Sequence, residues 1–325
     1  MAVYTHLSAN DLAELIACYD VGDLVSAKGI AEGISNSNWL VETTGSKDAG
    51  ARFILTMYER RIAIADLPFF LGLLDHLAAK GLPVPRTIHD RDGAGFRMLG
   101  DKAVALIEFL PGISVEVPTI AQARAVGVAL AEMHLASTDY GRTRTNELRP
   151  ADWAHIVSQA GDDAIAAIDP ALPRIIQGSL AQVVDAWPEH LPRSIIHADL
   201  FPDNVLIIGP RVEALIDFYF ACEDISAYDL AVTHVAWSFA DQGRTFRPDT
   251  GAAILEGYRS VRGLSRYEIE ALPLLAQGAA MRFVCTRIQD WLDTPAGALV
   301  TRKDPMDFAR RLEFYQREGK RVFDL

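Results

Sequence analysis

Several polar residues near position 200 have the types and spacing that phosphoryl transfer to a hydroxyl requires. They lie in the segments HADLFPDN (197–204) and IDF (216–218). Such a transfer needs a base for the acceptor hydroxyl, oxygen ligands for magnesium and groups that position the phosphates. Asp199 follows an apolar strand and is the candidate base. Asn204 and Asp217 can supply a neutral and a charged oxygen to a magnesium ion.

His197 has a different predicted role, because magnesium prefers oxygen ligands to imidazole nitrogen. We expect its ring to brace the catalytic loop through hydrogen bonds. A single aspartate in a loop most often caps a turn. The ordered set of His197, Asp199 and Asn204, followed by a two-strand hairpin and Asp217, favours phosphotransfer, because spacing and strand context agree.

These segments resemble the catalytic and metal-binding loops of the aminoglycoside phosphotransferase and choline kinase-like superfamily. The resemblance covers nearly the whole chain. It implies an α+β fold that is bilobal and protein-kinase-like, and a reaction that uses ATP and Mg²⁺. It also implies that Asp199 is the catalytic base and that Asn204 and Asp217 are the magnesium ligands.

A glycine-containing stretch, GIAEGISNSNWLVET (29–43), resembles the nucleotide loop of the same superfamily. Gly33, Ser35 and Asn36 could bring backbone or side-chain donors to the phosphates. The alternative is an ordinary glycine-rich hairpin. The segment IEFL (107–110) resembles the linker between the lobes, in which the backbone of Glu108 and Leu110 would hydrogen-bond adenine. Its alternative is an edge strand.

The sequence departs from the kinase pattern on the third strand, where a lysine usually reaches the phosphates and pairs with a glutamate on the next helix. Thr56 stands at that position, and the predicted helix 66–80 contains no glutamate. Arg60, Arg61 and Lys28 are alternative phosphate ligands, although such residues are more often solvated surface charges.

A longer set of segments resembles the bacterial homoserine kinases of this superfamily. They are EGISNSNWLVET, RFILTMYERR, DLPFFLGLLDHLA, HADLFPDN, LIDFYFAC and RFVCTRIQDW. The resemblance implies ATP-dependent phosphorylation of the side-chain hydroxyl of L-homoserine, a step of threonine biosynthesis. Homoserine is a zwitterion, so its carboxylate requires a cation and its ammonium group requires oxygen acceptors.

Five residues of the C-terminal part are candidates for homoserine binding. Arg282, Arg287 and Trp291 lie on one predicted helix, and Tyr219 and Asp224 follow the metal-binding aspartate. The alternative is that Arg287 forms a surface ion pair with Asp290 and that Trp291 is a core residue. Arg282 stands among apolar residues, so we expect it to have a buried partner.

Two other functions remain open at this point. A kinase for choline, hydroxylysine or an aminoglycoside would use the same catalytic residues, but a cation at Arg282 suits homoserine better than choline or an aminoglycoside. The missing strand lysine would also permit a nucleotide-binding pseudokinase. The intact set of Asp199, Asn204 and Asp217 opposes that interpretation.

Composition excludes some classes of partner. The chain has 325 residues, a formal net charge of −12 and three widely spaced cysteines, with a sequence pI near 5.1. We therefore expect small-molecule partners, no nucleic acid and no membrane binding. Unpaired cysteines and the lack of a signal-like or spanning segment favour a cytoplasmic protein.

The predicted elements place the catalytic segments in the second of two lobes. An N-capped helix opens the chain, and the strands 21–29, 36–44, 51–59, 95–99 and 103–109 with one later helix form an antiparallel N-terminal lobe, 1–110. The lobe 111–325 is mainly helical, with predicted helices at 119–135, 229–239, 252–259, 267–290 and 305–317. A hairpin, 204–208 with 212–216, follows the catalytic loop directly.

Overall fold

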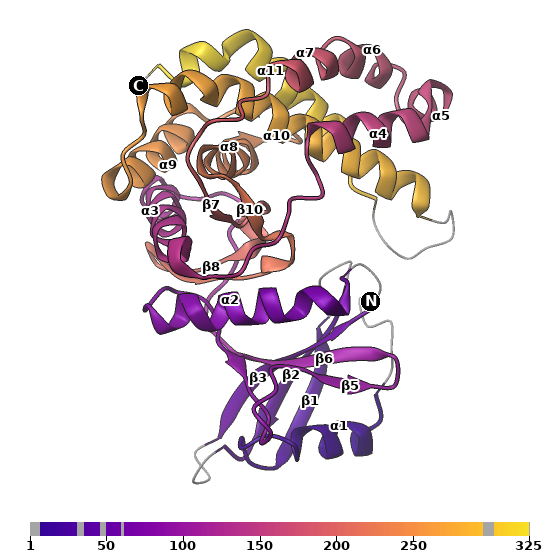
Figure 1. Cartoon of the computed structure of the whole chain (residues 1–325), viewed down its shortest axis with the longest axis vertical. Helices are drawn as coiled ribbons and strands as arrows, with labels where there is room; N and C mark the ends of the chain where they lie inside the picture. Colours follow the sequence, from indigo (N-terminus) through magenta and orange to yellow (C-terminus); the bar gives the residue numbers. More distant parts are fainter. Residues whose placement is uncertain (1–6, 31–35, 46–49, 60–61, 295–301, 325) are drawn as a thin grey trace. The chain divides into compact units, whose positions relative to one another are not determined.

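The computed structural model describes residues 7–30, 36–45, 50–59, 62–294 and 302–324. The chain divides into two compact units, Met1–Pro111 and Gly112–Leu325. Each unit has its own sheet or helix arrangement, labelled in Figure 1. The first unit is a sheet with helices, and the second is mainly helical, which confirms the predicted fold class.

Unit 1 contains an antiparallel sheet with strand order β1-β2-β3-β6-β4, and β5 pairs with β6. The strands are β1 (Leu24–Ile30), β2 (Asn36–Thr43), β3 (Ala51–Tyr58), β4 (Thr87–Ile88), β5 (Arg97–Leu99) and β6 (Lys102–Glu108). Burial alternates along β2, and its face with Trp39 and Val41 packs against helix residues Leu12 to Ile16. Strand β4 was not predicted, because two residues are too few to show a periodic pattern.

Two α-helices accompany this sheet, α1 (Ala9–Ile16) and α2 (Leu67–Ala79). Helix α1 begins with a capping box between Ser8 and Asp11, which satisfies N–H groups that have no partner inside the helix. Its apolar side joins Trp39 of β2 and Met57 of β3 in a common core. Helix α2 is tied to β4 by Thr87, whose N–H donates to Asp75 at 3.0 Å.

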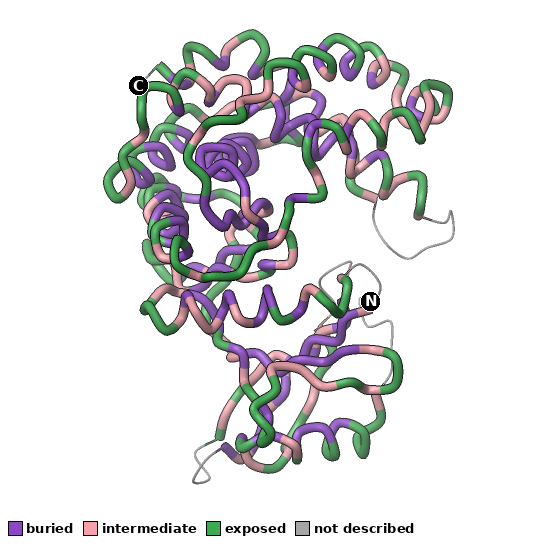
Figure 2. Tube along the Cα trace, viewed as in Figure 1, coloured by how far each residue is buried: buried purple, intermediate pink, exposed green. Residues whose placement is uncertain are grey.

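Unit 2 is built from nine helices among the residues that the structure describes. They are α3 (Ile120–Ala136), α4 (Pro150–Ala160), α5 (Asp162–Ile168), α6 (Leu172–Gln177), α7 (Leu180–Asp185), α8 (Ser226–Trp237), α9 (Pro248–Val261), α10 (Arg266–Asp293) and α11 (Met306–Val322). Every residue of α8 is buried, and Figure 2 shows it as the purple helix inside the unit. A helix that is buried all round provides a rigid support for residues packed against it.

Short two-stranded sheets carry the polar loops of unit 2. The pairs are β7 (Arg193–Ile196) with β10 (Cys222–Ile225), β8 (Val205–Ile208) with β9 (Arg211–Leu215), and β11 (Phe239–Ala240) with β12 (Thr245–Phe246). The hairpin β8-β9 confirms the predicted hairpin. Strand β10 was not predicted, because its sequence CEDI carries two charges and lacks an alternating pattern.

Helix α10 differs from the expectation that it breaks near Pro273. It runs without interruption from Arg266 to Asp293, with Pro273 inside. Pro273 is the eighth residue, and nearly all residues from Leu275 to Cys285 are buried. This packing outweighs the loss of one backbone hydrogen bond. Among the described residues, none of the helices has the length and apolar composition needed to cross a membrane.

Candidate active site

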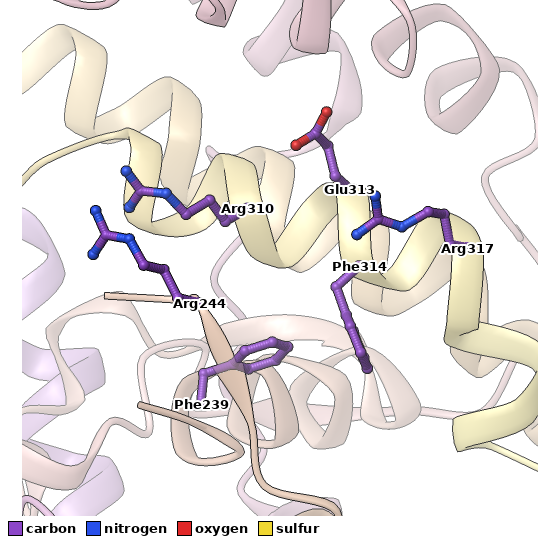
Figure 3. Close-up of a pocket in the computed structure, with 7 residues that line it drawn as sticks. Phe239, Arg244, Arg310, Glu313, Phe314 and Arg317 are labelled. Carbon is purple, nitrogen blue, oxygen red and sulfur yellow. The ribbon is translucent and has the colours of Figure 1, made fainter. Parts of the chain in front are cut away.

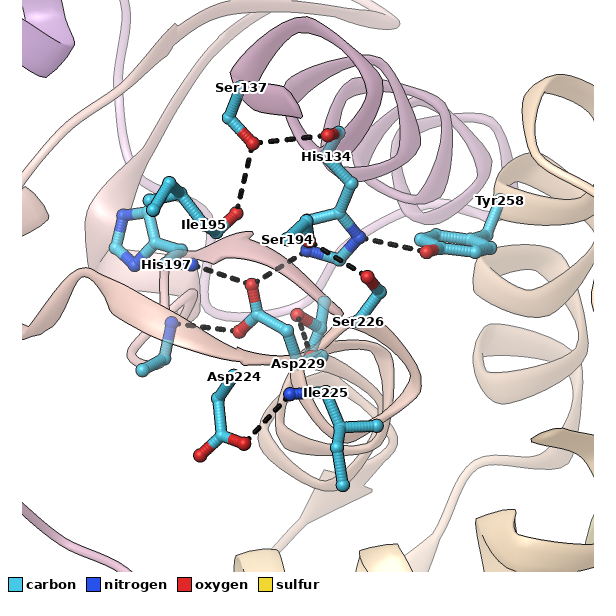
Figure 4. A network of polar contacts seen from close by, with 12 residues as sticks. His134, Ser137, Ser194, Ile195, His197, Asp224, Ile225, Ser226, Asp229 and Tyr258 are labelled. Carbon is cyan, nitrogen blue, oxygen red and sulfur yellow. Dashed lines mark hydrogen bonds and ion pairs between the residues drawn. The ribbon is translucent and has the colours of Figure 1, made fainter. Parts of the chain in front are cut away.

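The loop 197–204 leaves the end of β7 with an unusual backbone conformation. Ala198 has a φ of 63°, in the left-handed region that alanine rarely adopts. This conformation turns the N–H groups of His197 and Ala198 toward the protein interior. The Asp229 carboxylate of α8 accepts both, at 2.6 Å and 2.8 Å. A buried carboxylate therefore holds the strained start of the loop (Figure 4).

Asp229 is itself held by a chain of buried polar groups (Figure 4). His134 of α3 contacts the Asp229 carboxylate at 3.0 Å through Nε2, and its Nδ1 contacts the hydroxyl of Tyr258 in α9 at 2.8 Å. Burial acts to raise the pKa of Asp229, but hydrogen bonds from His134 and from the loop outweigh it and lower that pKa. The anchor is therefore ionised at neutral pH.

Two more residues fix the same loop from other directions. The guanidinium of Arg282 in α10 donates to the carbonyl oxygen of Ala198. The indole N–H of Trp237 in α8 donates to the carbonyl oxygen of Leu200 at 2.8 Å. Because both sides of the loop backbone are bonded, the side chain of Asp199 is presented by a rigid frame.

His197 connects the catalytic loop to the strand that precedes Asp217. Its Nδ1 accepts the N–H of Asp199 at 3.3 Å, and its Nε2 contacts the carbonyl oxygen of Ile216 at 3.0 Å. The ring therefore carries its proton on Nε2 and donates to Ile216. Burial lowers the pKa of His197, so the imidazole is neutral, as a bracing residue requires.

Asn204 links the catalytic loop to the second aspartate. Its Nδ2 donates to the carbonyl oxygen of Asp199 at 2.7 Å and to the Asp199 carboxylate at 3.2 Å. The Asn204 carbonyl oxygen accepts the N–H of Ile216 at 3.0 Å. Asp217 follows with a left-handed backbone, φ 64° and ψ 56°. The structure thus brings Asp199, Asn204 and Asp217 together, as expected from their order in the sequence.

The carboxylates of this cluster are hard to ionise together. Burial and the charge of Asp217 raise the pKa of Asp199 to about 7, against the lowering effects of Arg282 and Lys303. Surrounding protein atoms and Asp203 raise the pKa of Asp217 to about 6, although part of its side chain remains accessible to solvent. Excess negative charge of this kind favours a bound cation.

Asn204 and Asp217 fit a divalent cation by their chemistry. The Nδ2 of Asn204 donates to Asp199. Its Oδ1 receives no hydrogen bond from the described residues, so this oxygen can face a cation. Asp217 adds a carboxylate, and hard cations select such oxygen ligands. The described part of the chain holds no metal-ligating group of three or more histidine, cysteine, aspartate and glutamate side chains, so the candidate set is a mixed amide and carboxylate one.

Arg282 has the buried partner that its apolar setting requires. Only 2% of its surface is exposed, and its guanidinium stacks on Phe283 at 4.7 Å and Phe220 at 5.3 Å. The carbonyl oxygen of Ala198 takes one of its donors. The guanidinium is therefore buried behind the loop, where it bonds the backbone next to Asp199 and lowers the pKa of that residue.

Three other predicted substrate residues make contacts inside unit 2. Arg287 pairs with Asp307 at 2.8 Å and joins α10 to α11. Asp224 is buried and receives the amide of Asn146 at 2.7 Å and the guanidinium of Arg193 at 3.2 Å. Trp291 is partly buried and packs under Arg302 at 5.3 Å.

Tyr219 stays close to the cluster, since its N–H hydrogen-bonds Asp217. Sequence interpretation missed two further residues, Asp229 and Lys303. Asp229 is a charged residue inside the apolar run AYDLAVTHVAW, and this signal was available. Lys303 is exposed, and its ammonium lowers the pKa of both Asp199 and Asp217. Nothing in its local sequence distinguishes it.

The nucleotide candidates of unit 1 are only partly described. Gly33, Ser35, Arg60 and Arg61 lie outside the described residues. Asn36 is buried, and its Oδ1 has no hydrogen-bond partner among the described residues. The side chain of Glu108 is bound by Arg86 at 3.0 Å, and its backbone N–H donates to the carbonyl oxygen of Arg86 at 2.9 Å. Its own carbonyl oxygen is the group that could contact adenine.

The strand registers place Lys28 on the same face of the sheet as Thr56. Lys28 pairs with Leu40, and Leu40 pairs with Ile54, two residues before Thr56. Cross-strand partners share a face, and residues two apart do also. The hydroxyl of Thr56 donates to Asn38 at 2.8 Å, so the position that usually carries lysine is neutral and internally bonded.

Comparison with known proteins agrees with this geometry. The model of the phosphotransferase enzyme family APH matches residues 26–264. A homoserine kinase of Nitrobacter winogradskyi is 46% identical over 98% of this chain and 96% of its own length. A homoserine kinase of Acidiphilium cryptum is 47% identical over 98% of each chain.

Solved structures show the same fold at low identity. An amicoumacin kinase in complex with AMP-PNP, Ca²⁺ and amicoumacin has a TM-score of 0.68 at 14% identity and covers 98% of this chain and 94% of its own. A microcompartment-associated aminopropanol kinase has a TM-score of 0.70 at 20% identity, with 97% and 98% covered. The chain therefore belongs to the APH phosphotransferase enzyme family, together with the homoserine kinases of Nitrobacter and Acidiphilium.

Proposed function

We propose that this protein is an ATP-dependent kinase that phosphorylates the side-chain hydroxyl of L-homoserine. The observation that carries the proposal is the nearly full-length similarity to homoserine kinases, at 46% and 47% identity. The products are O-phospho-L-homoserine and ADP, and the step belongs to threonine biosynthesis. The cluster of Asp199, Asn204 and Asp217 supplies groups that such a transfer needs.

Asp199 is the group that accepts the proton of the homoserine hydroxyl. The hydroxyl oxygen forms a bond to the γ-phosphorus as the bond to the leaving ADP oxygen breaks, and the proton passes to the Asp199 carboxylate. One oxygen of that carboxylate is oriented by the amide of Asn204 at 3.2 Å. His197 and Asp229 act indirectly, because they fix the backbone that leads into the base.

Asn204 and Asp217 would hold the divalent cation, which we propose to be Mg²⁺. The cation, when bound, neutralises phosphate charge during the transfer. The raised pKa values of Asp199 and Asp217 support this assignment, because a cation relieves the repulsion among their carboxylates. Mg²⁺ is also the cation that accompanies ATP in most such enzymes.

Homoserine recognition needs a cation for its carboxylate, and we assign this role to Lys303. Its ammonium is exposed and acts on both aspartates of the cluster. Arg282 adds a fixed buried charge behind the loop. Tyr219, whose N–H hydrogen-bonds Asp217, is the remaining candidate of the predicted substrate set.

We assign nucleotide binding to residues 1–110 and the catalytic and acceptor groups to residues 111–325. In the first segment, the backbone of Glu108 and Leu110 would contact adenine. Gly33, Ser35 and Asn36 would contact the phosphates. Lys28 lies on the face that carries Thr56 and replaces the missing strand lysine as the source of positive charge.

We also assign the enzyme to the cytoplasm. Cys18, Cys222 and Cys285 are free thiols, and the last two are buried. Free thiols persist in a reducing compartment, where ATP is also abundant.

The test is ATP consumption by the purified protein with a panel of acceptors. The panel contains L-homoserine, L-threonine, choline, hydroxylysine and an aminoglycoside, each with Mg²⁺. We expect turnover with homoserine and a new phosphate-ester signal in the ³¹P spectrum. Turnover with another acceptor and none with homoserine would refute the substrate assignment, and no turnover with any acceptor would favour a pseudokinase.

A further inference from the structure

A site rich in arginine lies in unit 2, apart from the acidic cluster. It is a cavity of about 240 Å³ between α11 and the turn that joins β11 to β12. Figure 3 shows the side chains that line it. Arginine and phenylalanine dominate the lining, which consists of Phe239, Gly243, Arg244, Arg310, Glu313, Phe314 and Arg317. None of these residues belongs to the catalytic cluster.

The turn that forms one wall is pressed firmly against α11. Asp241, Gln242 and Gly243 all have positive φ, at 50°, 55° and 79°. A Cβ at Gly243 would lie 2.2 Å from the carbonyl oxygen of Asp307, so only glycine allows this close approach. The wall is therefore a fixed part of the unit and not a loose loop.

The same turn positions two of the arginines. Arg310 of α11 donates to the carbonyl oxygen of Gln242 at 2.9 Å. Arg244 donates to the side-chain oxygen of Gln242 at 3.1 Å and to the carbonyl oxygen of Asp241 at 3.1 Å. Both guanidinium groups thus converge on Gln242 and retain further donors.

The charge in this cavity is not balanced by the protein. Among the described residues, no carboxylate forms an ion pair with Arg244, Arg310 or Arg317. Most of the exposed arginines outside this cavity do form such a pair. The acidic Glu313 is shared with Arg174, which lies outside the cavity, at 3.3 Å. The three arginines and one glutamate leave an excess of two positive charges in the cavity, although the whole chain has a net charge of −12.

An aromatic surface accompanies these charges. The rings of Phe239 and Phe314 meet edge to face at 5.2 Å and line the same cavity. A concave site with an apolar surface and converging polar groups is typical of small-molecule binding. Guanidinium groups match phosphate through paired hydrogen bonds.

We propose that this arginine cavity binds a small phosphate monoester in its dianionic form. A phosphate monoester carries about two negative charges at neutral pH, which equals the excess of the cavity. A small cavity of this kind suits a metabolite of a few carbon atoms. The product of the proposed reaction belongs to this class, so the cavity would give the enzyme a second site for its own product.

The experiment is calorimetric titration of the whole protein with O-phospho-L-homoserine, without ATP and at low ionic strength. We expect two sites in the wild type and one in the variant that combines Arg244→Gln, Arg310→Gln and Arg317→Gln. Loss of three charged contacts should weaken the second site at least ~10-fold. Arg321→Gln, on the exposed end of α11, is the matched control and should keep both sites.

Inorganic phosphate and succinate separate the possible ligand chemistries. Phosphate should bind the wild type and not the triple variant, and this result does not depend on homoserine being the acceptor. Succinate binding tighter than phosphate would overturn the phosphate assignment, and equal phosphate binding by wild type and triple variant would overturn the site. If the triple variant melts early, the double variant Arg244→Gln, Arg317→Gln serves instead, since both of these arginines are exposed.

Discussion

The carboxylate of Asp229 accepts the backbone N–H of Ala198 at 2.8 Å, at a residue whose φ is 63°. Because Ala198 directly precedes Asp199, this contact sets the direction of the side chain that we propose as the base. Asp229→Asn replaces a charged acceptor by an amide whose NH₂ group would face one of the two backbone N–H donors, at His197 or Ala198. We expect it to lower the free energy of unfolding by about 3–5 kcal/mol and kcat by about 100-fold.

The measurement for Asp229→Asn combines thermal melting with steady-state kinetics below the melting transition. Asp185→Asn is the control, because Asp185 is exposed at the end of α7. A variant that melts early but keeps the kcat of the wild type would show that Asp229 supports the fold without orienting the loop.

Asp199→Asn tests the assignment of the base. The amide cannot take the hydroxyl proton, so we expect kcat to fall by about 10²–10⁴-fold, with binding of magnesium ATP retained. Kinetics and nucleotide binding by calorimetry measure the two effects separately. Asp249→Asn, at an exposed site in the first turn of α9, should behave like the wild type. Nearly normal turnover of Asp199→Asn would exclude the assigned role.

Lys303→Met tests recognition of the homoserine carboxylate. The ammonium of Lys303 acts on both Asp199 and Asp217, so it is near the reacting groups. We expect its loss to raise KM for homoserine about tenfold, since one charged contact is worth about 1.5–3 kcal/mol, and to leave KM for ATP almost unchanged. If KM for ATP rises instead, Lys303 contacts the nucleotide.

Lys28→Met is the complementary variant in unit 1. Lys28 shares the face of the sheet with Thr56, where a kinase normally has its phosphate-binding lysine. We expect KM for ATP to rise about tenfold while KM for homoserine stays the same. The two lysine variants control each other, because each should affect one substrate only. An unchanged KM for ATP would leave the phosphate role to another cation.

The grouping of Asp199, Asn204 and Asp217 was predictable from sequence because these residues lie close together along the chain. Asp199, Asn204 and Asp217 fall within 19 positions, and the hairpin between them has a clear strand pattern. Local spacing is sufficient when a loop and the next strand carry the whole site.

The long-range contacts were not predictable in the same way. Arg287, a predicted substrate residue, pairs with Asp307, twenty residues later on α11. Asp224 follows Asp217 closely in the sequence, yet it bonds Asn146, 78 residues away. Which partner a charged side chain selects depends on helix packing, and that packing has no signature in local periodicity.

His234 gives a prediction for the pH dependence of stability. It is buried in α8, its Nδ1 contacts the hydroxyl of Tyr315 at 2.7 Å, and its Nε2 has no partner among the described residues. Burial lowers the pKa of His234 to about 3, whereas an unfolded histidine has a pKa of about 6.5. Between these values the unfolded state binds the extra proton, so stability falls as the pH is lowered.

Protonation of His234 in the unfolded state should lower the free energy of unfolding by about 2 kcal/mol between pH 6.5 and pH 5. His234→Gln removes the titrating group, so its melting temperature should fall less over this interval than that of the wild type, whatever its stability at pH 7. The measurement is thermal melting from pH 7 to pH 5. His190→Gln, at an exposed site, should keep the slope of the wild type. An equal slope for His234→Gln would mean that His234 accepts a proton in the folded state.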